Sequence, residues 1–284
     1  MIFKAVFSVF YSSASALIGR WPMKDIRELK FQAGSREELL PGFAPEFPCI
    51  ASRVELDCYP GRCAPWHWHR AAELFYVENG SIEYHTPGGS LTFSEGSGGY
   101  VNSNVLHMTK AAPGTVQLLH IFDPALLSGE QDSRIGRRYI APLTASPVEL
   151  LPLFPEDAAQ AELLALLLNS FHLAEDSFGY ELRLRGALSG LWLGLLGQAQ
   201  PMLEGKLAHS RTSGQIKQMM AYIHERYAER ITVSELAASA FLSERECYRA
   251  FRNCLHTTPV EYMTSFRLQA ACRMLEQGQE PITG

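Results

Sequence analysis

Residues 231–238, with the sequence ITVSELAA, combine a helix start signal with apolar residues at helical spacing. Thr232 is placed to accept the free backbone N–H groups of the first turn, and Glu235, three residues later, completes a capping box. The residues expected on the buried face of this helix are Val233, Leu236, Ala237 and Ala240.

A second short helical pattern follows, with Ser243 placed to cap it and with Cys247, Ala250, Phe251 and Cys254 on its apolar face. Two short helices joined by a tight turn predict a helix-turn-helix, whose second helix enters the major groove of DNA. The candidate DNA contacts are Ser243, Glu244, Arg245, Tyr248, Arg249 and Arg252. Arginine suits both guanine edges and phosphates, whereas the alternative interpretation is an ordinary solvated helix face.

The segment resembles the AraC/XylS family of bacterial transcription regulators. The matching stretches are 216–222, 231–237, 242–243, 249–251, 259–262 and 267–271. In that family, two helix-turn-helix units joined by a long helix enter successive segments of the major groove. The resemblance implies that residues 243–255 form the first recognition helix and residues 259–276 the linker helix.

Two departures from that family pattern affect the expected DNA-binding domain. His256 stands where the family usually has a glycine after the recognition helix, and we expect an altered turn because glycine would supply a left-handed cap there. Pro281-Ile282-Thr283 matches the point where the second unit would begin. The sequence therefore predicts an incomplete DNA-binding domain over 215–284.

A second pattern lies upstream and resembles the first motif of the cupin superfamily, carried by Gly61, His67, His69, Glu73 and Gly80. Residues 74–78 and 81–85 alternate around Asn79-Gly80, which predicts a hairpin, and residues 87–89 predict another turn before 91–93. Residues 96–107 resemble the second cupin motif, although Asn102-Ser103-Asn104 replaces the usual proline-x-glycine. The implied fold is a small antiparallel barrel with a cavity at its mouth.

The resemblance places His67, His69, Glu73 and His107 at the positions that bind a metal in cupin enzymes. His67 and His69 would share one face of a strand, because side chains repeat every two residues. Three imidazoles and a carboxylate suit iron, manganese, zinc or nickel. Sensor cupins of AraC-type regulators often keep similar histidines without a metal. We therefore expect these four residues to form a metal-free ligand pocket, with no cofactor. Further pocket candidates, each better explained as barrel core, are Trp66, Trp68, Phe75, Tyr84, Tyr100 and His120.

The 284 residues accommodate two domains with a connector, and the expected fold class is α+β. The expected segments are an N-terminal extension over 1–22, a cupin-like sensor domain over 23–145, a helical connector over 146–205, a linker over 206–214 and an all-α helix-turn-helix domain over 215–284. Two apolar helical patterns, 158–174 and 180–203, are expected to cover the barrel, and they either form a homodimer contact or pack only within the chain.

The charge distribution, the N-terminal residues and the cysteines further limit the possible functions. The formal net charge is −5, but residues 211–284 carry nine lysines and arginines against eight acidic residues, a weak excess for a DNA-binding domain. Residues 1–18 resemble a short signal peptide, and we favour an upstream extension before Met23 over export. The six cysteines show no close metal-binding spacing; Cys58 and Cys63 flank a turn and could pair, but we expect a reduced, cytoplasmic protein. Residues 1–18 lack the length and uniform hydrophobicity of a membrane span, and no membrane partner is expected.

These observations predict a transcription regulator that binds DNA and a small-molecule effector, forms a homodimer and is not an enzyme. Two alternatives remain open. The first is a truncated regulator that only senses ligand and does not bind DNA by itself. The second is a metal-dependent cupin enzyme using His67, His69, Glu73 and His107.

Overall fold

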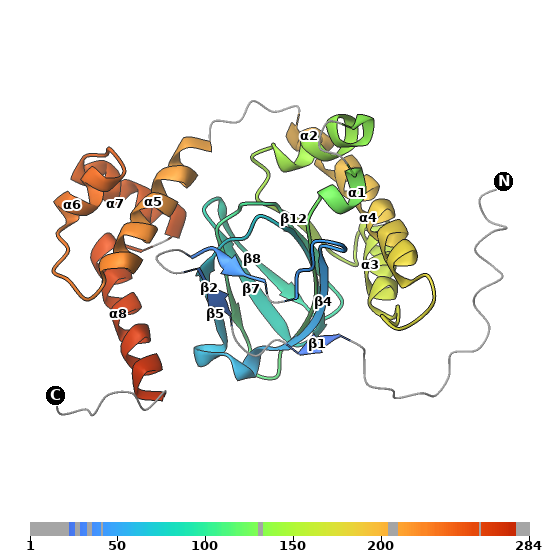
Figure 1. The fold of residues 1–284 in the computed structure, drawn as a ribbon, viewed down its shortest axis with the longest axis horizontal. Helices are drawn as coiled ribbons and strands as arrows, with labels where there is room; N and C mark the ends of the chain where they lie inside the picture. Colours follow the sequence, from blue (N-terminus) through green and yellow to red (C-terminus); the bar gives the residue numbers. More distant parts are fainter. Residues whose placement is uncertain are drawn as a thin grey trace.

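A barrel of two facing β-sheets occupies the middle of the molecule, with helices on two opposite sides of it (Figure 1). The structure is a computed structural model that describes residues 23–25, 29–32, 36–40, 42–129, 133–203, 210–255 and 257–276. The predicted N-terminal extension, His256 and residues 277–284 lie outside these described residues. No helix within the described ranges is long and apolar enough to cross a membrane.

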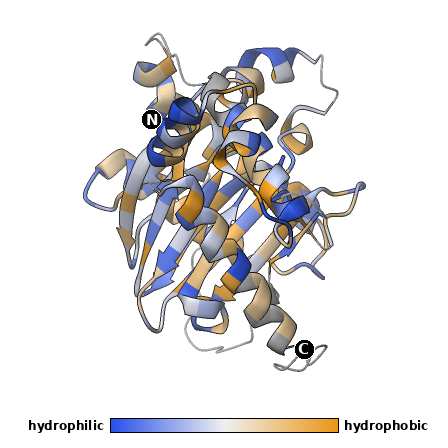
Figure 2. Cartoon of the chain, turned by 90° about the vertical axis from the view of Figure 1, so that its left-hand side faces the viewer, coloured by the Kyte–Doolittle hydropathy of each residue, from blue (hydrophilic) through white to orange (hydrophobic). Residues whose placement is uncertain are grey.

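The larger sheet has the strand order β1-β4-β11-β6-β9-β12, and the smaller has the order β5-β10-β7-β8. The strands of the larger sheet are β1 (Lys24–Asp25), β4 (Cys49–Glu55), β6 (Ala72–Asn79), β9 (Gly98–Val101), β11 (Val116–Phe122) and β12 (Leu150–Leu153). Those of the smaller sheet are β5 (Cys63–His67), β7 (Ser81–Thr86), β8 (Gly89–Ser94) and β10 (His107–Ala111). A separate pair, β2 (Lys30–Phe31) and β3 (Glu38–Leu39), lies beside the smaller sheet. Buried and more exposed positions alternate along β4 and β7, because successive side chains face opposite sides of a sheet. Figure 2 shows both hydrophilic and hydrophobic segments within the strands.

The predicted hairpin at Asn79-Gly80 is wrong, although both flanking strands are present. β6 pairs with β9 and β11, whereas β7 pairs with β8 and β10, so the turn carries the chain from one sheet to the other. Gly80 has φ +81°, and its neighbours are bonded to the turn before β11: the Asn79 amide donates to the Gly114 carbonyl, and Ser81 exchanges two hydrogen bonds with the Thr115 hydroxyl. The predicted turn at 87–89 does close a true hairpin between β7 and β8.

The predicted connector helices are confirmed as α3 (Ala158–Phe171) and α4 (Tyr180–Leu203), which cover the outer face of the larger sheet. Leu74, Tyr100, Leu118 and Phe122 of the sheet form one apolar core with Leu164, Leu167, Leu188 and Trp192 of these helices. Shorter helical turns complete this side: α1 (Ala125–Ser128), the π-helical turn η3 (Gly136–Ile140) and α2 (Ala141–Thr144). Two further turns, η1 (Leu56–Cys58) and η2 (Pro60–Arg62), precede β5.

Asn102 belongs to the stretch that departs from the second cupin motif, and its side chain links the barrel to the connector by hydrogen bonds. Its side chain accepts a hydrogen bond from the Tyr100 hydroxyl and donates to the carbonyls of Leu143 and Val148. Asn102 is buried, and these partners satisfy its amide. The residue that breaks the expected motif therefore has a structural role in this chain.

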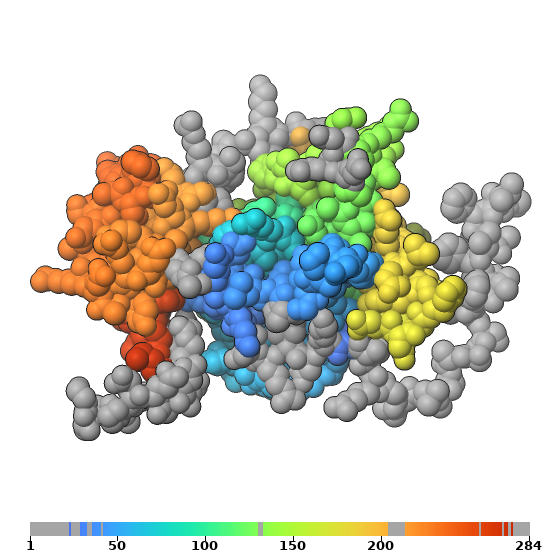
Figure 3. Space-filling model, in the orientation of Figure 1, coloured from blue at the N-terminus to red at the C-terminus, as the bar shows by residue number. Residues whose placement is uncertain are grey.

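Helices α5 (Ser210–Arg226), α6 (Val233–Ser239), α7 (Glu244–Leu255) and α8 (Pro259–Glu276) lie on the other side of the barrel, opposite α3 and α4 (Figure 3). The last residues of the predicted linker, 210–214, belong to α5. An apolar cluster joins these helices to the barrel, because Trp66 and Leu106 pack with Ile216, Met220 and Phe251. We call α5–α8 the DNA-binding unit, after the role predicted for it.

Candidate functional site

The smaller sheet brings together the histidines that the sequence singled out. His67 ends β5 and is directly opposite His107, which begins β10. His69 follows two residues after His67, and Glu73 reaches the group from β6 in the larger sheet. All four side chains are buried, and the three histidines are able to place nitrogen atoms within 4.8 Å of one another.

The backbone orients each of the three imidazole rings. The Nδ1 atoms of His67, His69 and His107 lie 2.7, 2.9 and 2.9 Å from the carbonyl oxygens of residues 65, 71 and 105, respectively. A carbonyl only accepts, so Nδ1 carries the proton and donates in each case, and a neutral ring then presents Nε2 as an acceptor. Glu73 Oε2 lies 3.3 Å from His69 Nε2 and 3.7 Å from His107 Nε2.

Opposing effects set the charges in this cluster. Burial by itself raises the pKa of Glu73, but the adjacent His107 and His69 rings hold it well below its usual range. Burial and the neighbouring His107 and His69 hold the pKa of His67 well below its ordinary value. Tyr84 donates to Glu73 Oε1 at 2.8 Å, and burial together with Glu73 raises the pKa of this tyrosine. The cluster thus holds an ionised carboxylate among imidazole nitrogens.

The donor set fits a divalent cation. Three imidazoles and a carboxylate suit zinc, iron, manganese or nickel, and hydrogen bonds from Nδ1 to fixed oxygens are the usual support for metal-binding histidines. His107 Nε2 is buried and has no hydrogen-bond partner among the described residues. His67, His69, His107 and Glu73 would be the ligands, and the ion would supply a positive charge and Lewis acidity.

The cavity beside this cluster is small. Its volume is about 40 Å³, and apolar side chains such as Val54, Leu56 and Ile121 form much of its wall. One water requires roughly 10–15 Å³ on this measure, and pockets for drug-sized molecules have roughly 300–1,000 Å³. The cavity therefore has room for an ion and a few waters, rather than for a large organic effector.

Of the further pocket candidates, only Tyr84 lines this cavity. Phe75 stacks against Tyr84 in the barrel core, while Tyr100 packs against Trp192 on the connector side. His120 also faces the connector, with its ring stacked on Phe171. Trp66 and Trp68 point towards the DNA-binding unit, where both belong to its apolar cluster. Sequence alternation places residues on opposite faces of a strand but does not tell which face lines the cavity.

Structure also adds Glu38 of β3, which no sequence motif indicated. Its Oε2 lies 3.8 Å from His67 Nε2, and its side chain is buried. Burial raises the pKa of Glu38 to about 7, the charge of His69 lowers it and the charge of Glu73 raises it. Residues 36–40 carry no recognisable spacing, so only the fold could bring this second carboxylate to the cluster.

The second candidate site is the helix-turn-helix formed by α6 and α7. The capping box predicted for Thr232 and Glu235 is confirmed, and Ser243 with Glu246 forms another at the start of α7. Phe241, in the turn, adopts φ +56° and is 90% exposed. The predicted inner face of α7 is buried, with Cys247, Ala250, Phe251 and Cys254 in the apolar cluster.

The opposite face of α7 carries the predicted DNA contacts. Glu244, Arg245, Arg249 and Arg252 are exposed, and Tyr248 is half-buried. Arg249 lies 3.9 Å from Glu246 in a solvent-exposed ion pair, which leaves its guanidinium accessible. Ser243 donates to Glu246 Oε2 and caps the helix, so its hydroxyl has a local partner. The geometry gathers three arginines on one face of a well-capped helix.

Comparison with known proteins finds one matching family and several similar proteins. Residues 55–122 match the Cupin domain family. The chain is 26% identical over 251 residues to the uncharacterized HTH-type transcriptional regulator YdeC of Bacillus subtilis, covering 87% of this chain and 85% of the relative. It is 23% identical over 219 residues to the probable transcriptional regulator LumQ of Photobacterium leiognathi, covering 77% and 79%.

Two solved structures align with most of this chain. The apo form of a ToxT variant from Vibrio cholerae aligns with a TM-score of 0.38 and 10% identity, covering 76% of this chain and 97% of the other. The AraC-like transcriptional activator CuxR aligns with a TM-score of 0.36 and 12% identity, covering 79% and 73%. The resemblance predicted from the sequence, a cupin domain in a relative of HTH-type regulators, is confirmed.

Proposed function

We propose that this cupin-containing relative of HTH-type transcription regulators is itself a transcription regulator. It contacts DNA through α6 and α7 and responds to a ligand held in the barrel. The observation that carries the proposal is the exposed arginine face of α7, in a chain related over most of its length to proteins named as regulators. This role requires no bond to be made or broken.

Arg245, Arg249 and Arg252 supply the groove and backbone contacts in this proposal, with Glu244 and Tyr248 beside the base edges. The second helix of such a unit lies in the major groove, and arginine pairs with guanine or phosphate there. Residues 211–284 have a net charge of only +1. Because counterion release drives much of DNA affinity, we expect binding by one unit to weaken steeply with salt.

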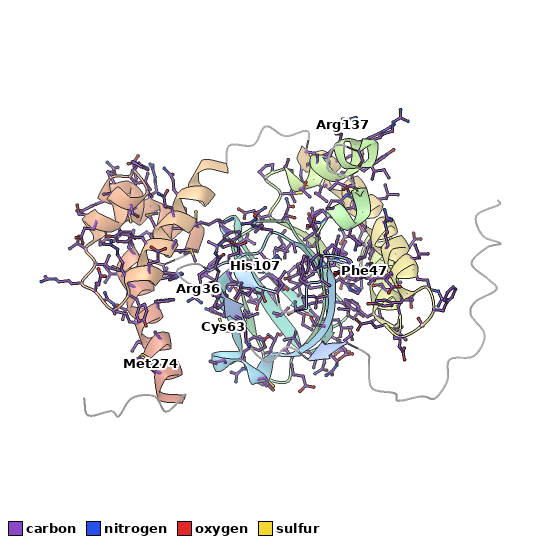
Figure 4. The ribbon with its side chains drawn as sticks, in the orientation of Figure 1. Arg36, Phe47, Cys63, His107, Arg137 and Met274 are labelled. Atoms are coloured by element: carbon purple, nitrogen blue, oxygen red, sulfur yellow. The ribbon has the colours of Figure 1, made fainter. Side chains whose placement is uncertain are left out.

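A DNA titration at low and moderate salt tests this proposal, using genomic fragments adjacent to the gene and an unrelated fragment of equal length. We expect tighter binding to an adjacent fragment, weakened by replacement of the three α7 arginines with alanine. Arg137→Ala is the matched control, because Arg137 is exposed on η3, away from the DNA-binding unit (Figure 4). Equal binding by the triple variant and the control would refute the assigned role of α7.

We also propose that the regulator is a homodimer formed through α4. Leu182 and Leu193 are 75% and 57% exposed, and Gly186 and Ser189 lie between them at helical spacing. Small residues between two exposed leucines suit close approach of the same helix from a second copy. Sedimentation should show a dimer for the wild-type chain and a monomer for Leu182→Asp with Leu193→Asp. A dimer that survives both substitutions would exclude this face.

The second candidate function is a metal-dependent cupin enzyme, which the histidine cluster favours. An enzyme needs space for substrate beside the metal, whereas the cavity here is only about 40 Å³ and its histidines are buried. Elemental analysis after purification without chelator decides whether a metal is held. The enzyme is favoured if metal is present and DNA binding is absent at low salt.

A further inference from the structure

Five possible ligand atoms lie close together beside the barrel cavity, and this donor set suits a cation. They are the Nε2 atoms of His67, His69 and His107, together with carboxylate oxygens of Glu73 and Glu38. With each Nδ1 proton donated to a carbonyl, the three Nε2 atoms are acceptors in the neutral rings, and so is the ionised Glu73 carboxylate. Buried acceptors without donors are unfavourable unless a positive charge lies among them.

We propose that a divalent cation bound by this cluster is the effector, that Glu38 closes its site, and that the segment containing Glu38 transmits cation binding to the DNA-binding unit. This inference rests on the proposed regulatory function. Glu38 lies in β3, outside the residues that match the Cupin domain. Its contribution is therefore specific to the N-terminal segment of this chain.

Backbone hydrogen bonds fix that segment to the histidine-bearing strand. Glu38 N donates to the Trp68 carbonyl at 2.8 Å, and Trp68 N donates to the Arg36 carbonyl at 3.0 Å. Trp68 stands between His67 and His69, so movement of residues 36–38 directly affects the stretch that presents both rings. A cation that draws Glu38 inward also fixes this pairing.

Arg36, two residues before Glu38, joins the same segment to the DNA-binding unit. Its guanidinium carbon lies 4.8 Å from the ring centroids of both Phe31 and Phe266, so it bridges β2 and α8. Its Nε lies 3.4 Å from His224 Nε2 on α5. Figure 4 places Arg36 between the barrel and the DNA-binding unit, with His107 on the barrel side. One short segment thus contacts the cation site at Glu38 and the DNA-binding unit at Arg36.

The outer faces of the two histidine-bearing strands form a second connection. Trp66, Trp68, Leu106 and Met108 alternate with the histidines and belong to the apolar cluster of the DNA-binding unit. The Lys217 ammonium of α5 lies 4.4 Å above the Trp68 ring and donates to the Asn104 carbonyl. Asn104 N in turn donates to the His69 carbonyl at 2.8 Å. The cation site and the interface are therefore separated by the thickness of one strand.

A ligand shifts a conformational equilibrium only through different affinities for its states. The arrangement with Glu38 in place is also the one with Arg36 docked between Phe31 and Phe266. A cation that requires Glu38 therefore stabilises the docked position of the DNA-binding unit. By linkage, loosening the docked unit weakens cation binding by the same factor.

The test compares Glu38→Gln with Glu37→Gln in the full chain after removal of metals by chelation. Glu37 is the neighbouring carboxylate, and it pairs with Arg70 at 2.9 Å. Its charge also acts on Lys217 of α5, so Glu37→Gln controls for the loss of a charge beside the interface. Zinc is titrated calorimetrically, and hydrogen exchange is followed at residues 216–223 and 262–266 with and without saturating zinc. Near-native circular dichroism is required of both variants before comparison.

We expect one zinc per chain in the wild type and in Glu37→Gln, with slower exchange at the interface when zinc is bound. Glu38→Gln should bind zinc about tenfold or more weakly, the usual loss when a group supporting a metal is removed. At saturating zinc it should show little slowing of exchange. The coupling is overturned if Glu38→Gln matches Glu37→Gln in both measurements, or if zinc binds the wild type without slowing exchange at the interface.

A parallel DNA titration with the same samples separates this inference from the proposed function. Zinc-dependent protection without any DNA binding would count against the regulatory function and leave the coupling standing. DNA binding without a zinc effect on interface exchange would leave the regulator standing and overturn the coupling.

Discussion

Acidification should destabilise this protein through His120, which is completely buried between β11 and α3. The Ser170 hydroxyl donates to the Leu167 carbonyl at 2.6 Å, so it accepts from His120 Nε2 at 2.8 Å. His120 Nδ1 is then the unprotonated nitrogen, and it has no hydrogen-bond partner among the described residues. A second proton would lie on that atom in an apolar setting, next to Phe171.

Burial lowers the pKa of His120 from 6.5 to about 3. Because the folded-state pKa is depressed, the unfolded chain binds the proton first as pH falls, and stability present above pH 6.5 is lost progressively down to about pH 3. Each pH unit within that window costs about 1.4 kcal/mol. Between pH 7 and pH 5, His120 alone should therefore reduce the free energy of unfolding by about 2 kcal/mol.

Urea denaturation at pH 7 and pH 5 measures this loss for the wild type, His120→Gln and His172→Gln. The glutamine amide retains a donor for Ser170 but does not titrate, so His120→Gln should lose about 2 kcal/mol less than the wild type over this interval. His172→Gln is the matched control, because His172 is exposed at the end of α3. Equal losses for the wild type and His120→Gln would show that His120 is not held neutral by burial.

Three further substitutions test separate parts of the structure. Arg249→Ala should weaken specific DNA binding by about 1–3 kcal/mol if its guanidinium reads a base edge, and unchanged affinity in a folded variant would remove that role. Thr232→Ala deletes one half of the α6 capping box and should lower the free energy of unfolding by about 1 kcal/mol, measured by chemical denaturation. Gly98→Ala would place a Cβ 2.3 Å from the Phe75 carbonyl oxygen and should destabilise the barrel by roughly 2 kcal/mol or more. Its control, Gly214→Ala on α5, has no atom within 4 Å of the new Cβ and should be neutral or stabilising in the same assay.

Local sequence was sufficient where local physics decides the structure. Thr232 and Glu235 satisfy each other's backbone groups within one turn, so the start of α6 was visible in four residues. The strands flanking Asn79-Gly80 were equally visible from their alternation. The pairing of these two strands was not visible in the sequence. β9 and β11, which follow later in the chain, occupy the two edges of β6, so β7 does not pair with it.

The candidate site shows the same division between local and distant effects. His67, His69 and His107 were found because motif spacing places them on neighbouring strands. Glu38 and Arg36 were missed because no periodicity distinguishes residues 36–40 from an ordinary polar loop. Their importance follows only from burial beside the histidines and beside α8, which the fold creates.

The alternation that places the histidines on one face of a strand also indicates how their site is connected to the DNA-binding unit. A strand that directs His67 and His69 into the barrel must direct Trp66 and Trp68 outward. Two large exposed indoles would be unfavourable on a solvated sheet face, and here α5 and the helix-turn-helix cover them. Lys217 keeps its charged group above the Trp68 ring, and burial lowers the pKa of this lysine to about 8. The tryptophans are therefore better explained as the surface on which the DNA-binding unit docks than as the lining of a ligand pocket. The inward histidines of the same strand are the residues through which a bound ligand would act on the DNA-binding unit.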